Sequence, residues 1–282
     1  MILIFGTTGQ VARELALQAG PRQVMALSRT EADLSDPGTC AAHILRNQPK
    51  AVINAAAYTA VDKAEEEETL AHRINAEAPA AMAQACANFG IPFLHVSTDY
   101  VFAGTGEAPY APDDPTDPQN AYGRTKLAGE EAVRAIGGAH AILRTSWVFS
   151  EHGTNFVKTM LRLSETRDTL KIVADQIGGP TPARGIAAAL WTMCDAMLAG
   201  NPGGTFHYTG APKTSWKCFA RETFAIAGRK VAVTGIPTTD YPTPAARPLN
   251  SRLDCSSLTT EFGIKQPSWR DALDDTIKAL LI

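Results

Sequence analysis

The sequence lacks the features that mark a nucleic-acid-binding protein or a membrane protein. Its 26 Lys and Arg residues are outnumbered by 29 Asp and Glu residues, and the formal net charge is −3. This balance offers no positive surface to nucleic acid or to an anionic membrane. No apolar stretch of the sequence approaches the roughly 20 residues that a membrane-spanning helix needs. We therefore expect neither a nucleic-acid partner nor a membrane partner.

The sequence also has few cysteines and no recognisable export signal. The five cysteines are scattered, odd in number and form no Cys-x-x-Cys motif, which favours reduced thiols over a disulfide framework. The apolar run at the start meets Gly6 after five residues, and this is too short for the apolar region of a signal peptide. These absences predict a cytoplasmic protein.

What is present is an alternation of short apolar runs and longer helical patterns. Apolar runs at 1–5, 24–27, 51–54, 92–97 and 140–145 predict strands, and the segments between them predict helices. Repeated units of this length predict an α/β fold, a Rossmann-type doubly wound parallel sheet with helices on both faces. We expect this dinucleotide-binding domain to span 1–174. The remainder, 175–282, is expected to be mainly a smaller C-terminal substrate-binding cap with some return to the Rossmann domain, and 201–204 (NPGG) predicts a turn.

The first apolar run leads into a glycine turn. Gly6 and Gly9 follow the strand and precede a helix, and Ala12 is the third small residue. The missing side chains let the backbone approach a pyrophosphate, which the N–H groups of a helix N-terminus stabilise. The spacing Gly-x-x-Gly-x-x-Ala differs from the usual Gly-x-Gly-x-x-Gly fingerprint. The alternative is a glycine turn that binds nothing.

A tyrosine and a lysine stand four residues apart, at Tyr122 and Lys126. On a helix this spacing puts both side chains on one face. The ammonium group is expected to lower the pKa of the Tyr122 phenol, and the Thr98 hydroxyl at a strand end could complete a proton-transfer group around a carbonyl oxygen. The spacing is common by chance, but the glycine turn in the same domain gives it weight. Together these features indicate hydride transfer at a carbonyl or an alcohol.

Longer motifs narrow this interpretation. They are 54–65 (NAAAYTAVDKAE), 97–102 (STDYVF), 122–130 (YGRTKLAGE), 144–148 (RTSWV), 175–181 (DQIGGPT) and 241–251 (YPTPAARPLNS). With them, the chain resembles the dTDP-4-dehydrorhamnose reductase family of the extended short-chain dehydrogenase/reductase superfamily. The resemblance covers nearly the whole chain. It implies NADPH-dependent reduction of the 4-keto group of dTDP-4-dehydro-L-rhamnose, a nucleotide sugar, in dTDP-rhamnose biosynthesis.

The resemblance also implies roles for individual residues. Tyr122 would protonate the keto oxygen, Lys126 would hold the nicotinamide ribose, and Thr98 would donate a hydrogen bond to the same oxygen. The residues expected to contact substrate are Thr59, Val61, Thr98, Asp99, Tyr100, Tyr122, Trp147, Arg247 and Asn250. Two of these have structural alternatives. Trp147 could be a core residue, and Arg247, expected to anchor the diphosphate, could instead pair with Asp240 or Asp254.

The choice of cofactor is predicted from the end of the second strand. An acidic residue there would bind a ribose 2′-hydroxyl and repel a 2′-phosphate, whereas Ser28 and Arg29 can bind phosphate. We therefore expect NADPH, with NADH as an alternative cofactor and an exposed loop charge as the alternative role of Arg29. The expected cofactor-binding residues are Gly6, Gly9, Gln10, Val11, Ser28, Arg29, Asp33, Leu34, Ala56, Ala57, Tyr58, Val96 and Lys126.

One departure from the family pattern concerns metal. Some family members join subunits through magnesium held by glutamates, and Glu14 could match one such ligand. The corresponding loop position here is Arg184, and an arginine cannot ligate a hard cation. We predict no metal site. A homodimer stays an open prediction, and we do not expect magnesium to bridge it.

Two other function classes stay open. A related nucleotide-sugar dehydratase would place an Asp-Glu pair after the strand-end threonine, whereas Thr98 is followed by Asp99 and Tyr100. This disfavours dehydration and leaves epimerisation open. A non-catalytic regulatory subunit of the same fold is disfavoured by the presence of Thr98, Tyr122 and Lys126 together.

Overall fold

The six strands of the main sheet all run parallel in the computed structural model, which describes residues 1–281. In spatial order they are β2 (Val24–Leu27), β1 (Ile2–Phe5), β3 (Ala51–Asn54), β4 (Phe93–Thr98), β5 (His140–Thr145) and β10 (Gly203–His207). The chain order reverses between β1 and β3. The carboxyl ends of the strands at such a switch point form a natural ligand crevice.

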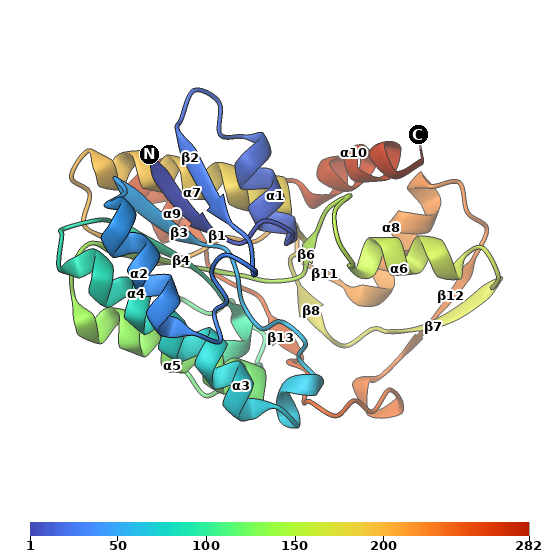
Figure 1. Ribbon diagram of the computed structural model, residues 1–282. Helices are drawn as coiled ribbons and strands as arrows, with labels where there is room; N and C mark the ends of the chain where they lie inside the picture. The colour runs from blue at the N-terminus through green and yellow to red at the C-terminus, as the bar shows by residue number, and fades with distance from the viewer. Residues whose placement is uncertain (282) are drawn as a thin grey trace.

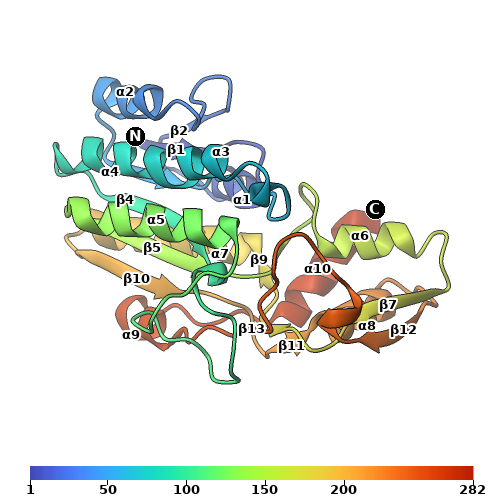
Figure 2. The same ribbon diagram turned by 90° about the horizontal axis from the view of Figure 1, so that it is seen from below.

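Helices cover both faces of this sheet (Figures 1 and 2). On one face lie α1 (Gln10–Leu17) and α7 (Ala183–Leu198), and on the other lie α2 (Pro37–Asn47), α4 (Ala78–Ala87) and α5 (Ala121–Ile136). Ile4 and Ile53 pack on the first face, and Leu3 and Val52 pack on the second. Strands buried on both faces are apolar throughout. Short apolar runs in the sequence therefore predicted them. The predicted α/β doubly wound fold is confirmed.

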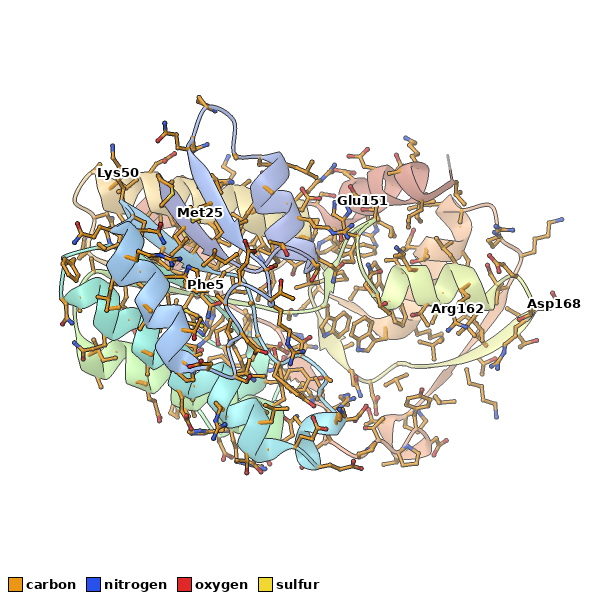
Figure 3. All side chains as sticks on the ribbon, in the orientation of Figure 1. Phe5, Met25, Lys50, Glu151, Arg162 and Asp168 are labelled. Atoms are coloured by element: carbon orange, nitrogen blue, oxygen red, sulfur yellow. The ribbon has the colours of Figure 1, made fainter. Side chains whose placement is uncertain are left out.

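A smaller lobe lies beside the C-terminal edge of the sheet (Figure 1). It contains α6 (Phe156–Leu163), β7 (Thr169–Val173), α8 (Trp216–Ile226), β12 (Ala232–Ile236) and α10 (Trp269–Leu281). β7 and β12 pair in parallel, and the lobe has hydrophobic clusters of its own. Arg162 and Asp168 lie in this lobe, far from Phe5 and Lys50 in the main domain (Figure 3).

Short elements connect the two parts. The short strands are β6 (Val148–Phe149), β8 (Ile177–Gly178), β9 (Thr181–Pro182), β11 (Thr214–Ser215) and β13 (Asn250–Ser251). The remaining helices are α3 (Glu68–His72), α9 (Ser256–Phe262), a π-helical turn at Arg73–Glu77, and 3-10 turns at Lys63–Glu65, Asp99–Val101 and Thr238–Asp240. None of the helices within residues 1–281 combines the length and apolar character needed to cross a membrane.

The division between the two parts differs from the predicted boundary at 174. Residues 156–173 belong to the smaller lobe, and α7, β10 and α9 return to the main domain, as was expected of part of 175–282. The predicted turn at 201–204 in fact contains the start of β10. Gly203 has a φ of +83°, and a Cβ there would lie 2.0 Å from the carbonyl oxygen of His140. This edge strand therefore begins with glycines, which allow close pairing with β5. Because glycines are also typical of turns, the sequence predicted a turn here.

The helical segment between β3 and β4 is interrupted by the π-helical turn. Asn75 in this turn accepts a hydrogen bond from the Tyr58 N–H (2.9 Å) and donates to the Tyr58 carbonyl (3.1 Å) and the Thr125 hydroxyl (3.1 Å). On α5, Gly129 faces the same turn, and a Cβ there would lie 2.1 Å from the Asn75 carbonyl oxygen. Gly129 thus allows α5 to approach the turn that holds the segment around Tyr58.

We expect Gly129→Ala to lower the free energy of unfolding by roughly 1–3 kcal/mol, because the added methyl group overpacks a backbone contact. Urea denaturation and the thermal midpoint would measure the loss. The matched control is Gly38→Ala in α2, where the new Cβ meets only Asp36 Oδ1 at 3.4 Å and the change should be neutral or stabilising. Equal stability of both variants would contradict the close approach of α5.

Candidate active site

A cavity of about 960 Å³ lies at the carboxyl ends of the main-sheet strands. The predicted cofactor residues that line it are Gly6, Gly9, Gln10, Val11, Arg29, Asp33, Leu34, Ala56, Ala57, Tyr58, Val96 and Lys126. The predicted substrate residues that line it are Thr59, Val61, Thr98, Asp99, Tyr100, Tyr122, Trp147 and Arg247. Ser28 and Asn250 do not line it. One cavity therefore gathers residues from both predicted sets and from both lobes.

The glycine turn forms one end of the cavity. Gly6 has a φ of +109°, and a Cβ there would lie 3.4 Å from the Cβ atoms of Ala12 and Ala56. Gly9 is the N-cap of α1, and no side chain accepts a hydrogen bond at this cap. The first N–H groups of the helix are thus available to an anion such as a phosphate.

Gln10 is committed to holding another part of the chain. Its side-chain Oε1 accepts hydrogen bonds from the Ser150 hydroxyl (2.8 Å) and from the Asn155 Nδ2 (2.9 Å). The amide therefore ties the glycine turn to the segment that leads into α6. Its Nε2 donates to the Val148 carbonyl (3.4 Å), so the backbone and the second Nε2 N–H of Gln10 are left for a cofactor contact.

The end of β2 differs from the expectation for Ser28. The Ser28 hydroxyl and N–H both donate to Glu31 Oε2 (2.6 and 2.8 Å), so its side chain turns away from the cavity. Arg29 lines the cavity, is 77% exposed at its side chain, and pairs with Asp33 at 3.2 Å. Glu31 was missed, although a Ser-x-x-Glu spacing allows the glutamate to accept from the serine N–H, as it does here.

Thr98 and Tyr122 are positioned by the ends of their elements. Thr98 closes β4, and its Oγ1 donates to Asp99 Oδ1 (3.1 Å) and accepts from the Tyr100 N–H (3.2 Å). Tyr122 lies in the first turn of α5, which is capped by Asn120 accepting from the Gly123 N–H (2.8 Å). The Tyr122 ring packs edge-on against Tyr100 with 5.4 Å between centroids. The cap and this packing fix the direction of the phenol.

Lys126 does not make the Tyr122 phenol more acidic in this arrangement. Its Nζ donates to the Val96 carbonyl (2.8 Å) and faces His95 Nε2 (3.1 Å). Burial raises the pKa of Tyr122 to about 12 and outweighs the lowering effect of the Thr98 hydroxyl. Burial also lowers the pKa of Lys126 to about 8. The expected lowering of the pKa of Tyr122 is thus wrong here, and the phenol keeps its proton at neutral pH.

Asp99 is the most unusual carboxyl group of the cavity. It is 3% exposed, and its Oδ2 has no hydrogen-bond partner among residues 1–281. Burial raises the pKa of Asp99 to about 6, against the lowering effect of hydroxyl groups around it. The hydroxyl groups that lower its pKa belong to Ser251 and Thr98, so the carboxyl is held by the protein while Asp99 lines the cavity.

An aromatic wall closes the cavity on the side of the smaller lobe. Trp147 stacks on Trp216 with 3.6 Å between ring centroids and 14° between planes, and Phe156 packs against Trp216. Trp147 has a φ of +51°, a conformation that is strained for a bulky residue and typical of functional sites. A Cβ on Gly178 would lie 2.8 Å from the Trp147 ring. Trp216 and Phe156 were missed because no local pattern links them to Trp147.

Arg247 pairs with Asp62, not with the two aspartates considered from sequence. Its Nη2 lies 2.7 Å from Asp62 Oδ2, and Asp62 Oδ1 accepts from the Ala245 N–H (3.2 Å). Arg247 nevertheless lines the cavity. Asn250 is 2% exposed and donates to the carbonyls of Thr105 and Ala108. The expected substrate contact of Asn250 is therefore wrong, because its amide is used to fasten a loop.

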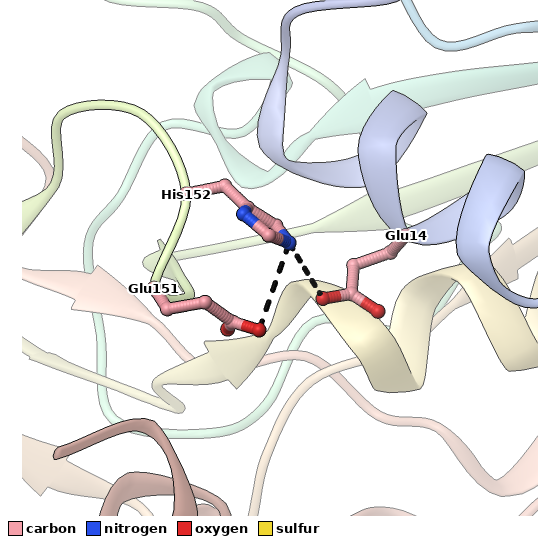
Figure 4. A group of neighbouring side chains, drawn as sticks. All are labelled: Glu14, Glu151 and His152. Carbon is pink, nitrogen blue, oxygen red and sulfur yellow. Dashed lines mark ion pairs between the residues drawn. The ribbon is translucent and has the colours of Figure 1, made fainter. Parts of the chain in front are cut away.

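Three titratable side chains meet where α1 approaches the smaller lobe (Figure 4). His152 Nε2 lies 3.4 Å from Glu14 Oε1 and 3.6 Å from Glu151 Oε1. Arg184, the position at which the resemblance places a glutamate ligand, pairs with Asp275 of α10 at 2.6 Å. Arg184 thus supplies a cation to an ion pair and no ligand to a metal.

The parallel doubly wound sheet, the glycine turn, and the Thr98, Tyr122 and Lys126 side chains around one cavity define the class. This is a Rossmann-type protein of the short-chain dehydrogenase/reductase kind. All of residues 1–282 match the family model described as the RmlD substrate binding domain. The chain belongs to that family.

Relatives and solved structures agree with this assignment. The chain is 44% identical to a dTDP-4-dehydrorhamnose reductase of Sinorhizobium fredii, with 100% of this chain and 98% of that one covered. It is 46% identical to a reductase of the same name from Burkholderia thailandensis, with 99% of each covered. A crystal structure of such a reductase from Clostridium acetobutylicum has a TM-score of 0.94 at 38% identity, covering 100% and 99%. Another, from Bacillus anthracis in complex with NADP, has a TM-score of 0.92 at 33% identity, covering 99% and 98%.

We expect Arg247→Met to weaken the binding of dTDP by about 10-fold or more, because a hydrogen bond to a charged group contributes roughly 1.5–3 kcal/mol. Titration calorimetry with dTDP would measure this. Asp62→Asn is the matched control, since it removes the ion pair and keeps the guanidinium. If both variants lose thermal stability equally and neither loses dTDP affinity, Arg247 only fastens the cap.

Proposed function

We propose that this protein reduces the 4-keto group of dTDP-4-dehydro-L-rhamnose with NADPH and forms dTDP-L-rhamnose, a step of dTDP-rhamnose biosynthesis. The observation that carries the proposal is the convergence of the glycine turn with Thr98, Tyr122 and Lys126 at one cavity. The names of the full-length relatives support the substrate. The NADP complex of the Bacillus anthracis protein supports the cofactor.

The residues present fit NADPH. Gly6 and Gly9 leave the backbone open to a pyrophosphate, and the start of α1 provides free N–H groups. Arg29 is the cation that would contact a 2′-phosphate, and Asp33 with Leu34 would contact the adenosine end. Ala56, Ala57, Tyr58 and Val96 would line the path towards the nicotinamide, and Lys126 would hold its ribose.

The chain's own residues supply the proton. When bound, NADPH supplies the hydride that adds to the carbonyl carbon. Tyr122, which keeps its proton because burial raises its pKa to about 12, would donate that proton to the carbonyl oxygen. Thr98, whose one hydroxyl proton goes to Asp99 Oδ1 in this structure, would turn that proton to the same oxygen and stabilise the charge that develops on it.

The sugar and nucleotide would lie between the lobes. Asp99 and Tyr100 line the cavity and would contact the sugar. Trp147, stacked on Trp216, offers a flat apolar surface to the sugar or the thymine. Thr59 and Val61 would form the opposite wall, and Arg247 would contact the diphosphate.

The cysteines support a reducing location. All five are free, and four are buried, as expected of a protein from a reducing compartment. Burial raises the pKa of Cys40, Cys86 and Cys194 to about 12, so these thiols are unreactive. We infer a cytoplasmic protein, and the homodimer stays a prediction.

We expect Tyr122→Phe to lower kcat by roughly 10²–10⁴-fold, the usual contribution of general acid catalysis. The assay follows the absorbance of NADPH in the presence of dTDP-4-dehydro-L-rhamnose. Cofactor affinity should be unchanged, since only the proton donor is removed. Turnover close to that of the wild type would contradict the role of Tyr122.

The same assay separates the function classes. A reductase consumes one NADPH for each sugar, whereas an epimerase changes the sugar without net consumption of cofactor. A regulatory subunit would do neither. No consumption of NADPH by the wild-type protein would therefore sink the proposal.

We expect Arg29→Ala to weaken NADPH binding by about 10-fold or more and to leave NADH binding nearly unchanged, because only NADPH carries the 2′-phosphate. Dissociation constants from titration calorimetry would show the difference. Arg162→Ala, an exposed cation of the smaller lobe, is the control for general charge effects. Equal losses of affinity for the two cofactors would mean that Arg29 does not contact the 2′-phosphate.

A further inference from the structure

His95 lies directly behind Lys126 and was not singled out by any motif. It is in β4 with 0% exposure, and its ring stacks near Phe93. Its Nδ1 faces Asn54 Nδ2 at 3.1 Å, and its Nε2 faces Lys126 Nζ at 3.1 Å. Asn54 and His95 are neighbours across β3 and β4. The imidazole therefore sits between an amide and the lysine that lines the cavity.

Both neighbours of the ring are hydrogen-bond donors when Lys126 is an ammonium group. The Asn54 amide cannot be turned around, because its Oδ1 accepts from the Ala56 N–H at 3.1 Å, so its NH₂ group must face the ring. A neutral imidazole has one N–H and one acceptor nitrogen, and an imidazolium has two N–H groups. With an ammonium on Lys126, at least one imidazole N–H would point at another donor.

The second fully buried histidine shows the normal arrangement. His207 Nδ1 faces the Tyr110 carbonyl at 3.0 Å, and its Nε2 faces Arg144 Nη1 at 3.3 Å. One neighbour accepts and the other donates, so the Nδ1–H tautomer of neutral His207 satisfies both. His95 has no such solution while Lys126 is charged.

An uncharged amine on Lys126 resolves the conflict at His95. The Nε2–H of His95 then donates to the Lys126 lone pair, and Nδ1 accepts from Asn54. Lys126 still donates to the Val96 carbonyl at 2.8 Å. Every polar atom of the group has a partner of the opposite kind, as buried polar atoms require.

We propose that His95 is a positioning residue that sets the protonation of Lys126, donating from Nε2–H to the lysine amine in this arrangement. Lys126 then takes a proton from solvent when it leaves His95 and turns to the cofactor ribose. The amine gains one proton and the imidazole keeps its own. The part concerning the ribose rests on the proposed function.

The surrounding charges are compatible with this assignment. Burial lowers the pKa of Lys126, and burial and the charge of Lys126 lower the pKa of His95, so an imidazolium is disfavoured. Glu130, one turn further along α5, acts in the opposite direction on Lys126. Its carboxylate is already bound by Arg144 of β5 (2.6 Å) and by Arg134 (3.1 Å).

The first test needs no ligand. In NMR spectra of protein with isotope-labelled histidine side chains, the ring nitrogens report which of them carries the proton. We expect an Nε2–H tautomer for His95 and an Nδ1–H tautomer for His207. The variants His95→Gln and His207→Gln assign the signals, and either one suffices because these are the two histidines with 0% exposure. An Nδ1–H tautomer of His95 would overturn the proposal.

The second test measures protons taken up when NADPH binds, by calorimetry in buffers of different ionisation enthalpy. Near pH 8, the 2′-phosphate, with a pKa of about 6, is already ionised. A lysine with a pKa of about 8 is half uncharged there, so the wild type should take up at least roughly half a proton.

The His95→Gln variant should take up at least about twofold less, because a glutamine can turn its amide oxygen to the ammonium group. The His207→Gln variant should match the wild type. Absence of uptake in the wild type, or equal uptake in all three proteins, would refute the link between His95 and Lys126. If NADPH does not bind at all, the proposed function fails while the tautomer result still decides the arrangement of His95.

Discussion

The parallel direction of the six main-sheet strands is the constraint on which the site depends. Because all strands point the same way, the residues that follow them meet at one edge, and Gly6, Thr98 and Thr145 come from three different strands. Helices cover both faces of the sheet, so this edge is where a ligand can reach the strand ends. The smaller lobe then needs only to supply a wall, and it does so with Trp216 and Phe156.

Behind that edge, three ionisable side chains are buried close together. Lys126 has 1% exposure, and one turn away Glu130 has 0% and binds Arg144, which has 2%. Removing one partner of such a pair would leave a buried charge unpaired, which is strongly destabilising. The Glu130–Arg144 contact joins α5 to β5. It therefore fixes the rotation of the helix face that carries Tyr122 and Lys126.

Much of the main domain could be predicted from sequence because its signals are local. The strands at 24–27, 51–54 and 140–145 have the bounds of β2, β3 and β5, since each apolar run is one strand. Thr98, Tyr122 and Lys126 line one cavity because Thr98 ends β4, Tyr122 lies in the first turn of α5 and Lys126 lies one turn further on the same face. Such local patterns can be interpreted without knowing which distant residues pack against them.

The features that could not be predicted depend on distant partners. The pairing of Arg247 with Asp62 joins residues from different lobes. The high pKa of Tyr122 results from burial by surrounding segments, which a Tyr-x-x-x-Lys spacing does not describe. The glycines of β10 are required only because β10 lies so close to the backbone of β5. In each case the residue is visible in the sequence, but its neighbour is determined by the fold.

The position of β10 has a consequence for how the chain folds. A fragment that stopped at residue 174 would lack β10 and α7, and β5 would become an unpaired edge with an uncovered apolar face. Such edges pair with strands of other molecules and aggregate. During synthesis residues 1–174 emerge before β10, so the six-stranded sheet is incomplete until the residues up to 207 have left the ribosome. The segment 156–173 emerges earlier than β10. Nascent chains therefore pass through a stage in which the unpaired edge of β5 must be protected from pairing with other molecules.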